Sequence, residues 1–386
     1  MSQWLSVLIF VSALLGVAIA LFWALGVGLW AHRTHRNRAQ RQDTPFVSVI
    51  VAGRNEESWI SGCLRALVAQ EYTADRLEII FVDDHSTDKT LEYATTIAET
   101  SGGCLRVISA PMCPSGVGPK KNALMAGIAI SKGDLLLFTD ADCVVPTGWV
   151  QAHVNCYDKQ TGAVTGPVFK PEGGAFVHRV AFWERVLIGM TSAAAIGWGK
   201  PASASGANFS YRRSIYDELG GLALAAVAAG DDDLMAQEIA RRGWQVDFAS
   251  GADAVVIETR FGSLRQQVHS AIRHQATLPH YPLFWRGLFA ASILAAMLQV
   301  PLFVLGIFLP EARIACWGGI AVRGLLDAWS TRRFARIYGF RPGILPLLVC
   351  ELALPFYLAG RALLSFFPAF SWHGRTLRKL APEASR

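Results

Sequence analysis

The chain carries little charge for its length. Of its 386 residues, 17% are charged and 52% are hydrophobic, and the formal net charge is +6. This composition is too apolar for an ordinary soluble enzyme, whereas the middle of the chain is too charged for a protein that lies wholly in a membrane. Length and composition therefore predict one sizeable globular domain accompanied by a few membrane spans.

The sequence also lacks the motifs of several common protein classes. No G-x-G-x-x-G fingerprint follows the first predicted strand, where the chain reads A-G-R-N-E over residues 52–56, and no Walker-type G-x-x-x-x-G-K-[ST] occurs anywhere. These absences argue against a nicotinamide enzyme and a P-loop ATPase. No basic patch is interleaved with aromatic residues, so nucleic acid is not expected as a partner.

The cysteines and histidines do not form a metal or disulfide pattern. The seven cysteines are scattered and contain no C-x-x-C pair, which favours a reducing compartment with neither a disulfide framework nor a zinc site. His269 and His274 are five residues apart, a spacing that is not a zinc signature.

An uncharged apolar run occupies residues 4–31. About 20 such residues suffice to cross a bilayer. A secretory signal is the alternative, but it would begin with basic residues and have a shorter apolar core of roughly 7–15 residues. Here the basic residues follow, at positions 33, 36, 38 and 41. The run is therefore predicted to be an uncleaved anchor, and the positive-inside rule places the domain that follows in the cytosol.

Strand and helix patterns alternate after residue 46. Apolar and β-branched runs predict strands at 46–52, 77–82 and 105–109 and from Leu135, with helices between them. Such alternation indicates an α/β domain with an open, mostly parallel sheet and right-handed crossovers. Sheets of this kind bind ligands beyond the carboxyl ends of their strands.

The strand from Leu135 ends in two carboxylates, Asp140 and Asp142. Residues i and i+2 of a strand point to the same side, so both side chains can converge on one cation just past its end. Mg²⁺ and similar ions prefer oxygen ligands and keep water or phosphate oxygens in their remaining positions. The pattern predicts a metal-diphosphate site; the alternative is a solvated pair that caps the turn before Pro146.

Two other predicted strands also end in polar clusters. Arg54 and Glu56 follow the first strand, and Asp83 and Asp84 follow the second. Because the carboxyl ends of parallel strands meet at one edge of the sheet, the three clusters should lie together. Their coincidence favours the binding site over a solvated turn.

The second half of the predicted domain is less regular. Residues 163–168 and 205–213 are predicted as strands. The apolar stretch 175–199 contains charges that make it a poor span, so helices in the membrane interface are favoured over plain core packing. Three aspartates at 231–233 open a helix that runs through Ala240. Capping explains carboxylates in a first helical turn, but three exceed that need, so at least one is predicted to have a chemical task.

The C-terminal third is again apolar and basic. A helical pattern covers 264–277. Residues 288–309 are predicted to span the membrane and 314–329 to form the return leg, which keeps the basic loop 332–341 in the cytosol. Residues 343–370 are interrupted by prolines, so two short re-entrant or interfacial helices are expected there. The predicted domains are an anchor (1–32), a globular domain (45–281), membrane helices (283–370) and a basic cytosolic tail (371–386).

Taken together, these motifs resemble family-2 glycosyltransferases of the GT-A fold over about residues 46–281. The matching segments are V-I-V-A-G-R-N-E-E (49–57), V-D-D-H-S-T-D-K-T (82–90), G-P-K-K-N-A-L (118–124), T-D-A-D (139–142, the DXD motif), G-A-N (206–208) and G-D-D-D-L (230–234).

The resemblance implies roles for individual residues. Nucleotide-sugar contacts are implied for the first five segments, at Ala52, Arg54, Glu56, Asp83, Lys120 or Lys121, Asp140 and Gly206. Asp83 would hold the base of the nucleotide, which favours a UDP-sugar. Asp142, with Asp140, would bind Mg²⁺ or Mn²⁺. Asp232 would be the general base.

One departure from the family pattern concerns chain elongation. Processive members carry Q-x-x-R-W after the base motif, where this chain reads S-A-I-R-H over 270–274. Arg273 is retained and could bind phosphate oxygens, but the tryptophan that stacks on a growing sugar chain is absent. A single transfer is therefore expected.

The combined prediction is a metal-dependent, inverting hexosyltransferase in the inner (cytoplasmic) membrane. Multiple membrane passes would hold its catalytic domain on the cytosolic side. It would move one sugar to a hydroxyl of a lipid or lipid-linked acceptor. The alternatives are a processive polysaccharide synthase and, in another class, a non-catalytic membrane scaffold that retains the GT-A fold. Neither the sugar, the acceptor nor the oligomeric state follows from the sequence.

Overall fold

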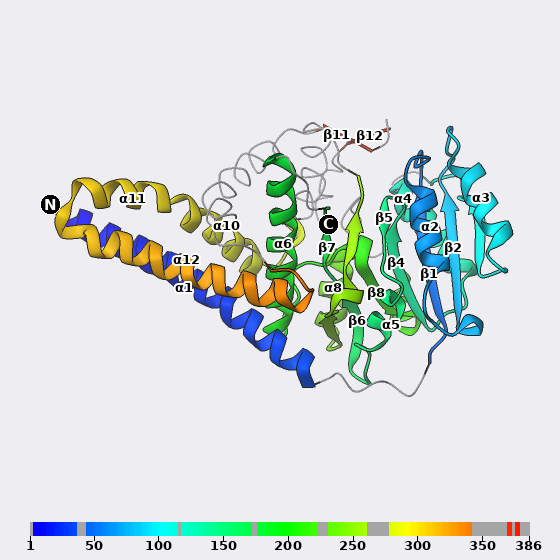
Figure 1. Cartoon of the computed structure of the whole chain (residues 1–386), viewed down its shortest axis with the longest axis horizontal. Coiled ribbons are helices and arrows are strands. Elements are labelled where there is room, and N and C mark those ends of the chain that lie inside the picture. The colour runs from blue at the N-terminus through cyan, green and yellow to red at the C-terminus, as the bar shows by residue number, and fades with distance from the viewer. Residues whose placement is uncertain are drawn as a thin grey trace, which may run out of the picture.

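A sheet domain and a bundle of long helices make up the protein. The structure, a computed structural model, describes residues 3–36, 44–114, 117–171, 176–221, 231–260, 278–341, 369–372 and 375–378. The sheet lies at one end of the elongated molecule, the bundle extends from it toward the N-terminus, and helix α6 stands between them (Figure 1).

Seven strands form the main sheet in the order β3-β2-β1-β4-β8-β6-β9. Neighbouring strands from β3 to β4 are parallel, β8 runs antiparallel to both its neighbours, and β6 and β9 are again parallel. The strands are β1 (Val47–Gly53), β2 (Leu77–Asp83), β3 (Leu105–Ser109), β4 (Leu135–Asp140), β6 (Thr161–Thr165), β8 (Phe209–Arg212) and β9 (Gln245–Phe248). The predicted α/β class with a mostly parallel sheet is confirmed.

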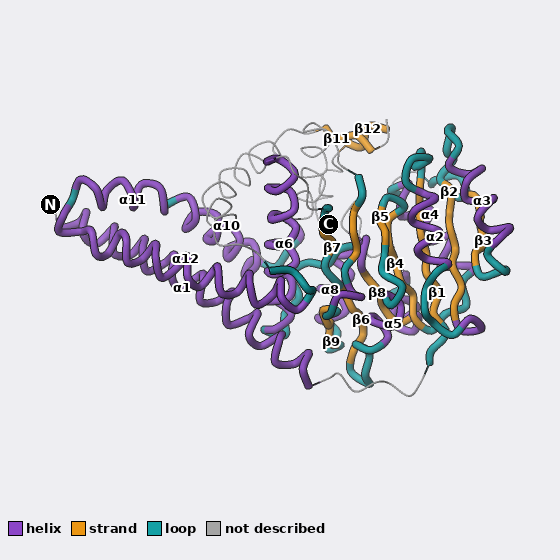
Figure 2. Tube along the Cα trace, viewed as in Figure 1, coloured by secondary structure: helices purple, strands orange, loops and turns teal. Residues whose placement is uncertain are grey.

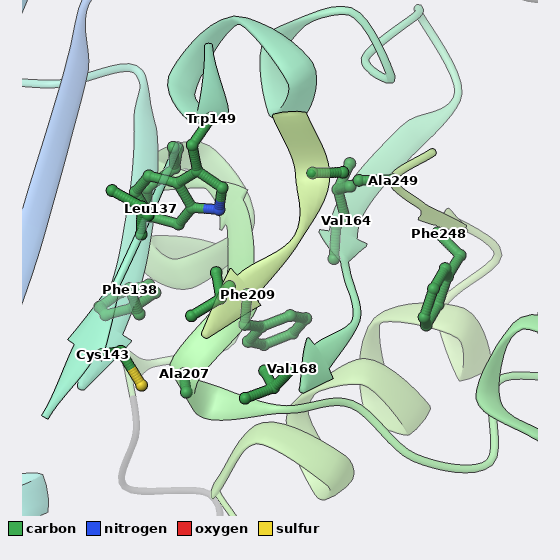
Figure 3. Close-up of a cluster of buried hydrophobic side chains, with 14 of the residues drawn as sticks. Leu137, Phe138, Cys143, Trp149, Val164, Val168, Ala207, Phe209, Phe248 and Ala249 are labelled. Carbon is green, nitrogen blue, oxygen red and sulfur yellow. The ribbon is translucent and has the colours of Figure 1, made fainter. Parts of the chain in front are cut away.

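Strands β1, β2 and β4 are buried along nearly their whole length. Continuous apolar runs fit this position, since helices cover both faces of a parallel sheet (Figure 2). Deeper in the domain, Leu137 of β4, Phe209 of β8 and Val164 of β6 are buried in one core (Figure 3). The carboxyl ends of the central strands are therefore held by a packed scaffold.

Amphipathic helices connect these strands. Ile60, Cys63, Leu64 and Leu67 form the buried face of α2, at the i, i+3, i+4, i+7 spacing of a helix packed on a sheet. Helix α4 begins with Pro119, whose missing N–H costs nothing at a first helical position. The helices are α2 (Ile60–Val68), α3 (Thr90–Thr100), α4 (Pro119–Ile130), α5 (Trp149–Val154), α7 (Arg213–Glu218) and α8 (Asp231–Arg241).

The prediction of one strand over 205–213 is wrong in its first part. Gly206–Asn208 form a 3-10 turn, η2, and β8 starts only at Phe209. The remaining 3-10 turns are η1 (Ala74–Arg76), η4 (Ala252–Ala254), η5 (Leu278–His280) and η6 (Pro310–Ala312). The turn changes the chain's direction just before the sheet, which leaves the Gly206 N–H available to a side chain.

A second, three-stranded sheet lies beside the main one. Strand β10 (Val256–Glu258) lies between β5 (Cys143–Val144), to which it is antiparallel, and β7 (Val168–Phe169), to which it is parallel. The predicted strand at 163–168 is divided between β6 and β7. Since β5 follows Asp142 directly, this sheet brings residues after β10 to the carboxylate pair. Strands β11 (Ala369–Trp372) and β12 (Arg375–Arg378) form a separate antiparallel pair.

Among the residues that the structure describes, two helical segments are long and apolar enough to cross a membrane, by length and composition. They are Trp4–Thr34, within α1 (Gln3–Arg36), and Leu283–Phe308, which comprises α10 (Leu283–Met297) and α11 (Gln299–Phe308). The predicted span 288–309 thus starts earlier and is divided in two. Pro301 accounts for the division, because its ring clashes with the carbonyl four residues before it, that of Met297. Helix α12 (Arg313–Ile337) packs along α1 and α11 as the return leg.

Helix α1 also belongs to the core of the sheet domain. Trp23, Val27 and Trp30 are buried in the same cluster as the strands, and Trp30 Nε1 donates a hydrogen bond to the Phe248 carbonyl at 3.1 Å. A Cβ on Gly26 would lie 2.6 Å from the Ala194 carbonyl of α6. Small residues therefore let α1 and α6 cross in close contact.

Residues 176–197 form one helix, α6 (Phe176–Gly197), which packs against α1, α12, β7 and β9. Phe182, Trp183, Val186 and Met190 are buried there. This corresponds to core packing, the alternative that the sequence analysis did not favour. A count of charges cannot distinguish a helix in a membrane interface from one enclosed by other helices.

Candidate active site

The loops after β1 and β2 are joined by hydrogen bonds. The Asn55 N–H donates to Ser86 Oγ at 3.0 Å, and the Thr87 N–H donates to Asn55 Oδ1 at 2.8 Å. Asn55 and His85 both have φ of 55°, in the left-handed region that asparagine and histidine adopt more readily than most residues. The pairing fixes both loops at the edge of the sheet where ligands are expected.

Asp83 lies at the end of β2, beside Gly53 in the register of the sheet. Its side chain is 2% exposed, and its Oδ2 accepts a hydrogen bond from the Ser86 N–H at 3.1 Å. Its Oδ1 is buried without a hydrogen-bond partner among the described residues. A buried acceptor in this condition costs free energy unless a donor is supplied, so Asp83 is suited to receive a ligand N–H.

Arg54 stabilises the neighbouring loop. Its Nη1 donates to the Asp84 carbonyl at 2.8 Å. Ala52 pairs in register with Asp140 of β4, so the ends of β1 and β4 lie side by side. Arg54 thus fixes the loop after β2 through one nitrogen of its guanidinium, and its nucleotide-sugar contact stays a prediction.

Lys120 and Asp140 form an ion pair at the end of β4. Lys120 lies in the first turn of α4 and its side chain is 42% exposed, whereas Lys121 is buried. Lys120 is thus placed beside Asp140.

Asp142 and Glu56 are joined by a residue that the sequence analysis missed. Arg260 Nε lies 3.1 Å from Asp142 Oδ2, and its Nη2 pairs with Glu56. Arg260 follows β10 and is separated from Glu56 by 204 positions. No local motif marks it; only the pairing of β10 with β5 brings it to the site.

Burial raises the pKa values of two carboxyl groups in this cluster, Glu56 and Asp142. The pKa of Glu56 is raised to about 7 by burial and by the charges of Asp142 and Asp140, although Arg260 opposes the shift. Burial, together with Asp140, also raises the pKa of Asp142. The cluster therefore concentrates negative charge in a poorly solvated place, which favours binding of a cation.

Asp232 and Asp233 of α8 have different surroundings. Asp232 Oδ2 accepts a hydrogen bond from the Gly206 N–H at 2.5 Å, and Asp233 Oδ1 accepts one from the Ala204 N–H at 2.8 Å. Burial raises the pKa of Asp232, while the Gly206 N–H and the charge of Lys120 lower it. Burial and Asp232 raise the pKa of Asp233 well above its usual value, opposed by a hydrogen bond with the Tyr281 side chain.

A buried polar network supports the turn that carries Gly206. Asn208 Oδ1 accepts from Trp149 Nε1 at 2.9 Å and lies 2.7 Å from His153 Nε2, and its Nδ2 donates to the Pro167 and Ala254 carbonyls. Burial lowers the pKa of His153 to about 4, so the ring is neutral near pH 7. Asn208 was recognised only as part of G-A-N, and neither Trp149 nor His153 was singled out.

The residues present fit a divalent cation shared with a ligand. In the described part of the chain no three His, Cys, Asp or Glu side chains form a metal-binding group. Asp140 and Asp142 supply hard oxygen ligands, which suits Mg²⁺ or Mn²⁺ if phosphate and water oxygens complete the coordination. Arg273 and the segment around it lie outside the described residues, so its expected phosphate contact stays a prediction.

Comparison with known proteins bears on the family and the fold of the chain. Residues 48–220 match the family model "Glycosyl transferase family 2". The probable glycosyltransferase YdaM of Bacillus subtilis is 33% identical over 220 residues, which cover 56% of this chain and 51% of that protein. The beta-monoglucosyldiacylglycerol synthase of Trichormus variabilis is 30% identical over 142 residues, which cover 36% of this chain and 30% of the synthase. The chain thus spans about half or less of the length of these relatives.

A similar fold occurs in the mannosyltransferase PcManGT from Pyrobaculum calidifontis, solved in complex with GDP-Man and Mn²⁺. The TM-score is 0.56 at 22% sequence identity, over 91% of this chain and 99% of the other. The fold is GT-A. The sequence matches support a family-2 glycosyltransferase domain over residues 48–220, as its motifs predicted. Asp232 and Arg260 lie beyond the matched range.

Proposed function

We propose that the protein is an inverting glycosyltransferase that moves one sugar from a nucleotide-diphosphate sugar to a hydroxyl of a lipid or lipid-linked acceptor. The observation that carries the proposal is the position of Lys120. It forms an ion pair with Asp140 of the metal motif, and its charge lowers the pKa of Asp232 at the start of α8. The candidate diphosphate site and the candidate base are therefore neighbours.

The donor nucleotide would lie across the ends of β1, β2 and β4. Asp83 Oδ1 is buried and without a hydrogen-bond partner among the described residues, and a nucleobase N–H would satisfy it. A uracil offers such a donor, which supports a UDP-sugar. The similarity to PcManGT does not favour uracil, since that protein was solved with GDP-Man.

Breaking the sugar–phosphate bond leaves negative charge on the diphosphate. A divalent cation held by Asp140 and Asp142 would neutralise part of that charge. The Lys120 ammonium lies beside Asp140 and would form charge-assisted hydrogen bonds to phosphate oxygens. Arg273 is proposed as a second phosphate ligand from the segment after the base helix. These groups stabilise charge where it develops, which is the largest contribution expected from such a site.

Asp232 is proposed as the general base. It would accept the proton of the acceptor hydroxyl as that oxygen attacks the anomeric carbon, which inverts the configuration there. The Gly206 N–H holds one carboxylate oxygen at 2.5 Å and so orients the side chain. Proton transfer of this kind contributes on the order of 10²–10⁴ in rate.

The acceptor is proposed to arrive from the membrane. Tyr281, which shares a hydrogen bond with Asp233, stands just before α10, the start of the second apolar segment. A bilayer around the helical bundle would place lipid hydroxyl groups on the same side of the domain as the base helix. The similarity to a beta-monoglucosyldiacylglycerol synthase supports a lipid acceptor. The proposed location is the inner membrane, with the domain in the cytosol.

The test is sugar transfer by the full chain in nanodiscs. UDP- and GDP-sugars would be supplied with Mn²⁺ and with diacylglycerol, ceramide or polyprenyl phosphate in the bilayer. Released nucleoside diphosphate and the mass of the lipid product are measured together. Addition of one sugar to a lipid is expected; a ladder of products would indicate a polysaccharide synthase, and no release with any donor would refute the enzyme.

The variant Asp142→Ala tests the proposed binding of the donor and its metal ion. Calorimetry in the presence of Mn²⁺ should show loss of metal-dependent binding of the nucleotide sugar, because one of two protein ligands is removed. Unchanged affinity would contradict the assignment of Asp142. Exposed Lys159→Met serves as a control for purification and folding.

A further inference from the structure

Arg260 lies in the candidate site but has no role in the reaction proposed above. Its guanidinium contacts Asp142 on one side and Glu56 on the other, and its side chain is 27% exposed. Glu56 is more deeply buried and forms an ion pair with Arg260. The pair therefore joins the loop after β1 to the metal motif after β4.

The contact leaves one oxygen of the Asp142 carboxylate for a cation. Arg260 Nε approaches Oδ2, whereas Oδ1 has the Cys143 thiol at 3.8 Å, a distance that permits only a weak contact. The guanidinium thus contacts the two carboxylates through different nitrogens, Nε toward Asp142 and Nη2 toward Glu56, and the charge attraction restricts the orientation of the Asp142 side chain. Partners of this kind, which contact a ligand rather than the metal, orient it and are worth about 10- to 100-fold in metal affinity.

The charge balance allows Arg260 and a divalent cation to be present together. Three carboxylates, Glu56, Asp140 and Asp142, face two cationic side chains, Lys120 and Arg260. The cluster has a formal charge of −1 when Glu56 is ionised and is neutral when Glu56 is protonated, so in neither state does a net positive charge repel a divalent ion with the guanidinium in place.

The backbone around Arg260 is also held firmly. The N–H and Oγ1 of Thr259 both donate to the Asp142 carbonyl, at 2.9 and 2.7 Å. Lys170 Nζ donates to the Arg260 carbonyl at 3.0 Å and to Glu258, which Arg185 of α6 also contacts. The segment after β10 is thus fixed to the metal motif at several points, as a positioning element requires.

We propose that Arg260 is a positioning residue: braced by Glu56, it holds the Asp142 carboxylate in the orientation that a divalent cation requires. In this arrangement Glu56 acts through Arg260 and not on the nucleotide. The inference rests on the metal-dependent transfer proposed above and adds two residues to it. A competing role, in which Arg260 takes the place of the cation and must be displaced, predicts the opposite change in metal affinity.

The experiment measures Mn²⁺ binding to the full chain in detergent without donor, by electron paramagnetic resonance of free Mn²⁺. Arg260→Ala should weaken binding by about 10- to 100-fold. Glu56→Gln should weaken it in the same direction, and the double variant should be no weaker than Arg260→Ala alone, because the two residues act as one unit. Arg241→Ala, which removes an exposed arginine of α8, is the matched control.

Unchanged or tighter Mn²⁺ binding by Arg260→Ala would overturn the proposal, and additive losses in the double variant would overturn the coupling to Glu56. Thermal unfolding shows whether each variant is folded. If Arg260→Ala is not, Arg260→Lys keeps the charge but has a single nitrogen and cannot contact Asp142 and Glu56 through separate nitrogens as the guanidinium does, and it should still bind Mn²⁺ more weakly than the wild type. Failure of the wild type to bind Mn²⁺ both without donor and with a nucleoside diphosphate present would instead count against the proposed metal-dependent function, because phosphate oxygens complete the proposed coordination.

Discussion

The sheet domain and the helical bundle distribute apolar and polar side chains in opposite ways. In β1, β2 and β4 almost every apolar side chain is buried. In the bundle, Trp4 is 80% exposed, Phe308 73% and Ile314 90%. The same bundle buries polar side chains, among them Gln299, Arg323 and Ser330.

Different solvents account for this difference. Water favours burial of apolar surface, whereas a lipid environment accepts apolar side chains outside and requires polar groups to be satisfied within the bundle. Ser330 Oγ donates to the Leu326 carbonyl, and Arg323 pairs with Asp327 at 3.3 Å. The arrangement supports the proposed insertion of α1, α10, α11 and α12 in a membrane.

Helix α1 takes part in both regions. Its first half has exposed large side chains such as Trp4, Phe10 and Leu14, whereas Val27, Trp30 and Ala31 of its second half are almost completely buried. Hydropathy alone treats these residues alike. Removal of residues 1–32 would therefore take away part of the domain core together with the proposed anchor, and a soluble leader should replace only the exposed half.

The largest expected effect is a loss of turnover on substitution of the proposed base, which lies in the sheet domain. Asp232→Asn should bind the donor normally and lose about 10²–10⁴ in turnover, because it removes the proposed base. Asp233→Asn is the matched control: the pKa of Asp233 is well above its usual value, so a neutral amide resembles its resting state. Release of nucleoside diphosphate measures both. A greater loss in Asp233→Asn would transfer the base role to that residue.

Substitutions in the two halves of α1 should have different effects on the free energy of unfolding. Trp30→Ala empties a fully buried site and removes a hydrogen bond to Phe248, so the free energy of unfolding should fall by about 3–5 kcal/mol. Trp4→Ala, on the same helix but 80% exposed, should change it little in detergent. Denaturant unfolding followed by circular dichroism provides the measurement. Equal effects of the two substitutions would mean that α1 is only an anchor.

Substitutions where α1 and α6 cross closely should have a smaller effect on the free energy of unfolding. A Cβ on Gly197 would clash with the Gly26 carbonyl, and a Cβ on Gly318 of α12 would meet nothing within 4 Å. Gly197→Ala should therefore destabilise the protein by about 1–3 kcal/mol, whereas Gly318→Ala should be neutral or stabilising, because alanine favours a helix. The same unfolding measurement compares them, and a neutral Gly197→Ala would show that the helices can separate without cost.

The features predicted correctly from sequence are those that local pattern determines. Continuous apolar runs placed β1, β2 and β4, and their polar ends placed Asp83 and Asp140 at one edge of the sheet. The parallel topology supplies the convergence, so no distant contact had to be known.

What the sequence did not reveal depends on contacts between distant segments. Arg260 becomes part of the site only because β10 pairs with β5, and a two- or three-residue strand has too little periodicity to be detected. Burial of Trp30 by protein instead of lipid likewise depends on packing against Phe248 and Phe334. The role of Gly206 follows from the turn η2, which its predicted strand concealed.

The smallest expected effect concerns the pH dependence of kcat/KM, which reports the ionisation of the proposed base in the sheet domain. Burial raises the pKa of Asp232, so this base is protonated at a higher pH than an exposed aspartate. Because only the ionised form accepts a proton, kcat/KM should fall as pH decreases through that raised pKa, on an acidic limb above the ordinary aspartate range.

Lys120→Met should move this limb further upward, since the charge of Lys120 lowers the pKa of Asp232. Lys159→Met removes an exposed lysine outside the site and should leave the limb in place. Profiles of kcat/KM against pH for the three proteins provide the comparison. The shift is the informative quantity, because Lys120→Met should also lower the rate at every pH. A lowered rate with an unmoved limb would mean that Lys120 acts on the diphosphate alone and that another group controls ionisation of the base.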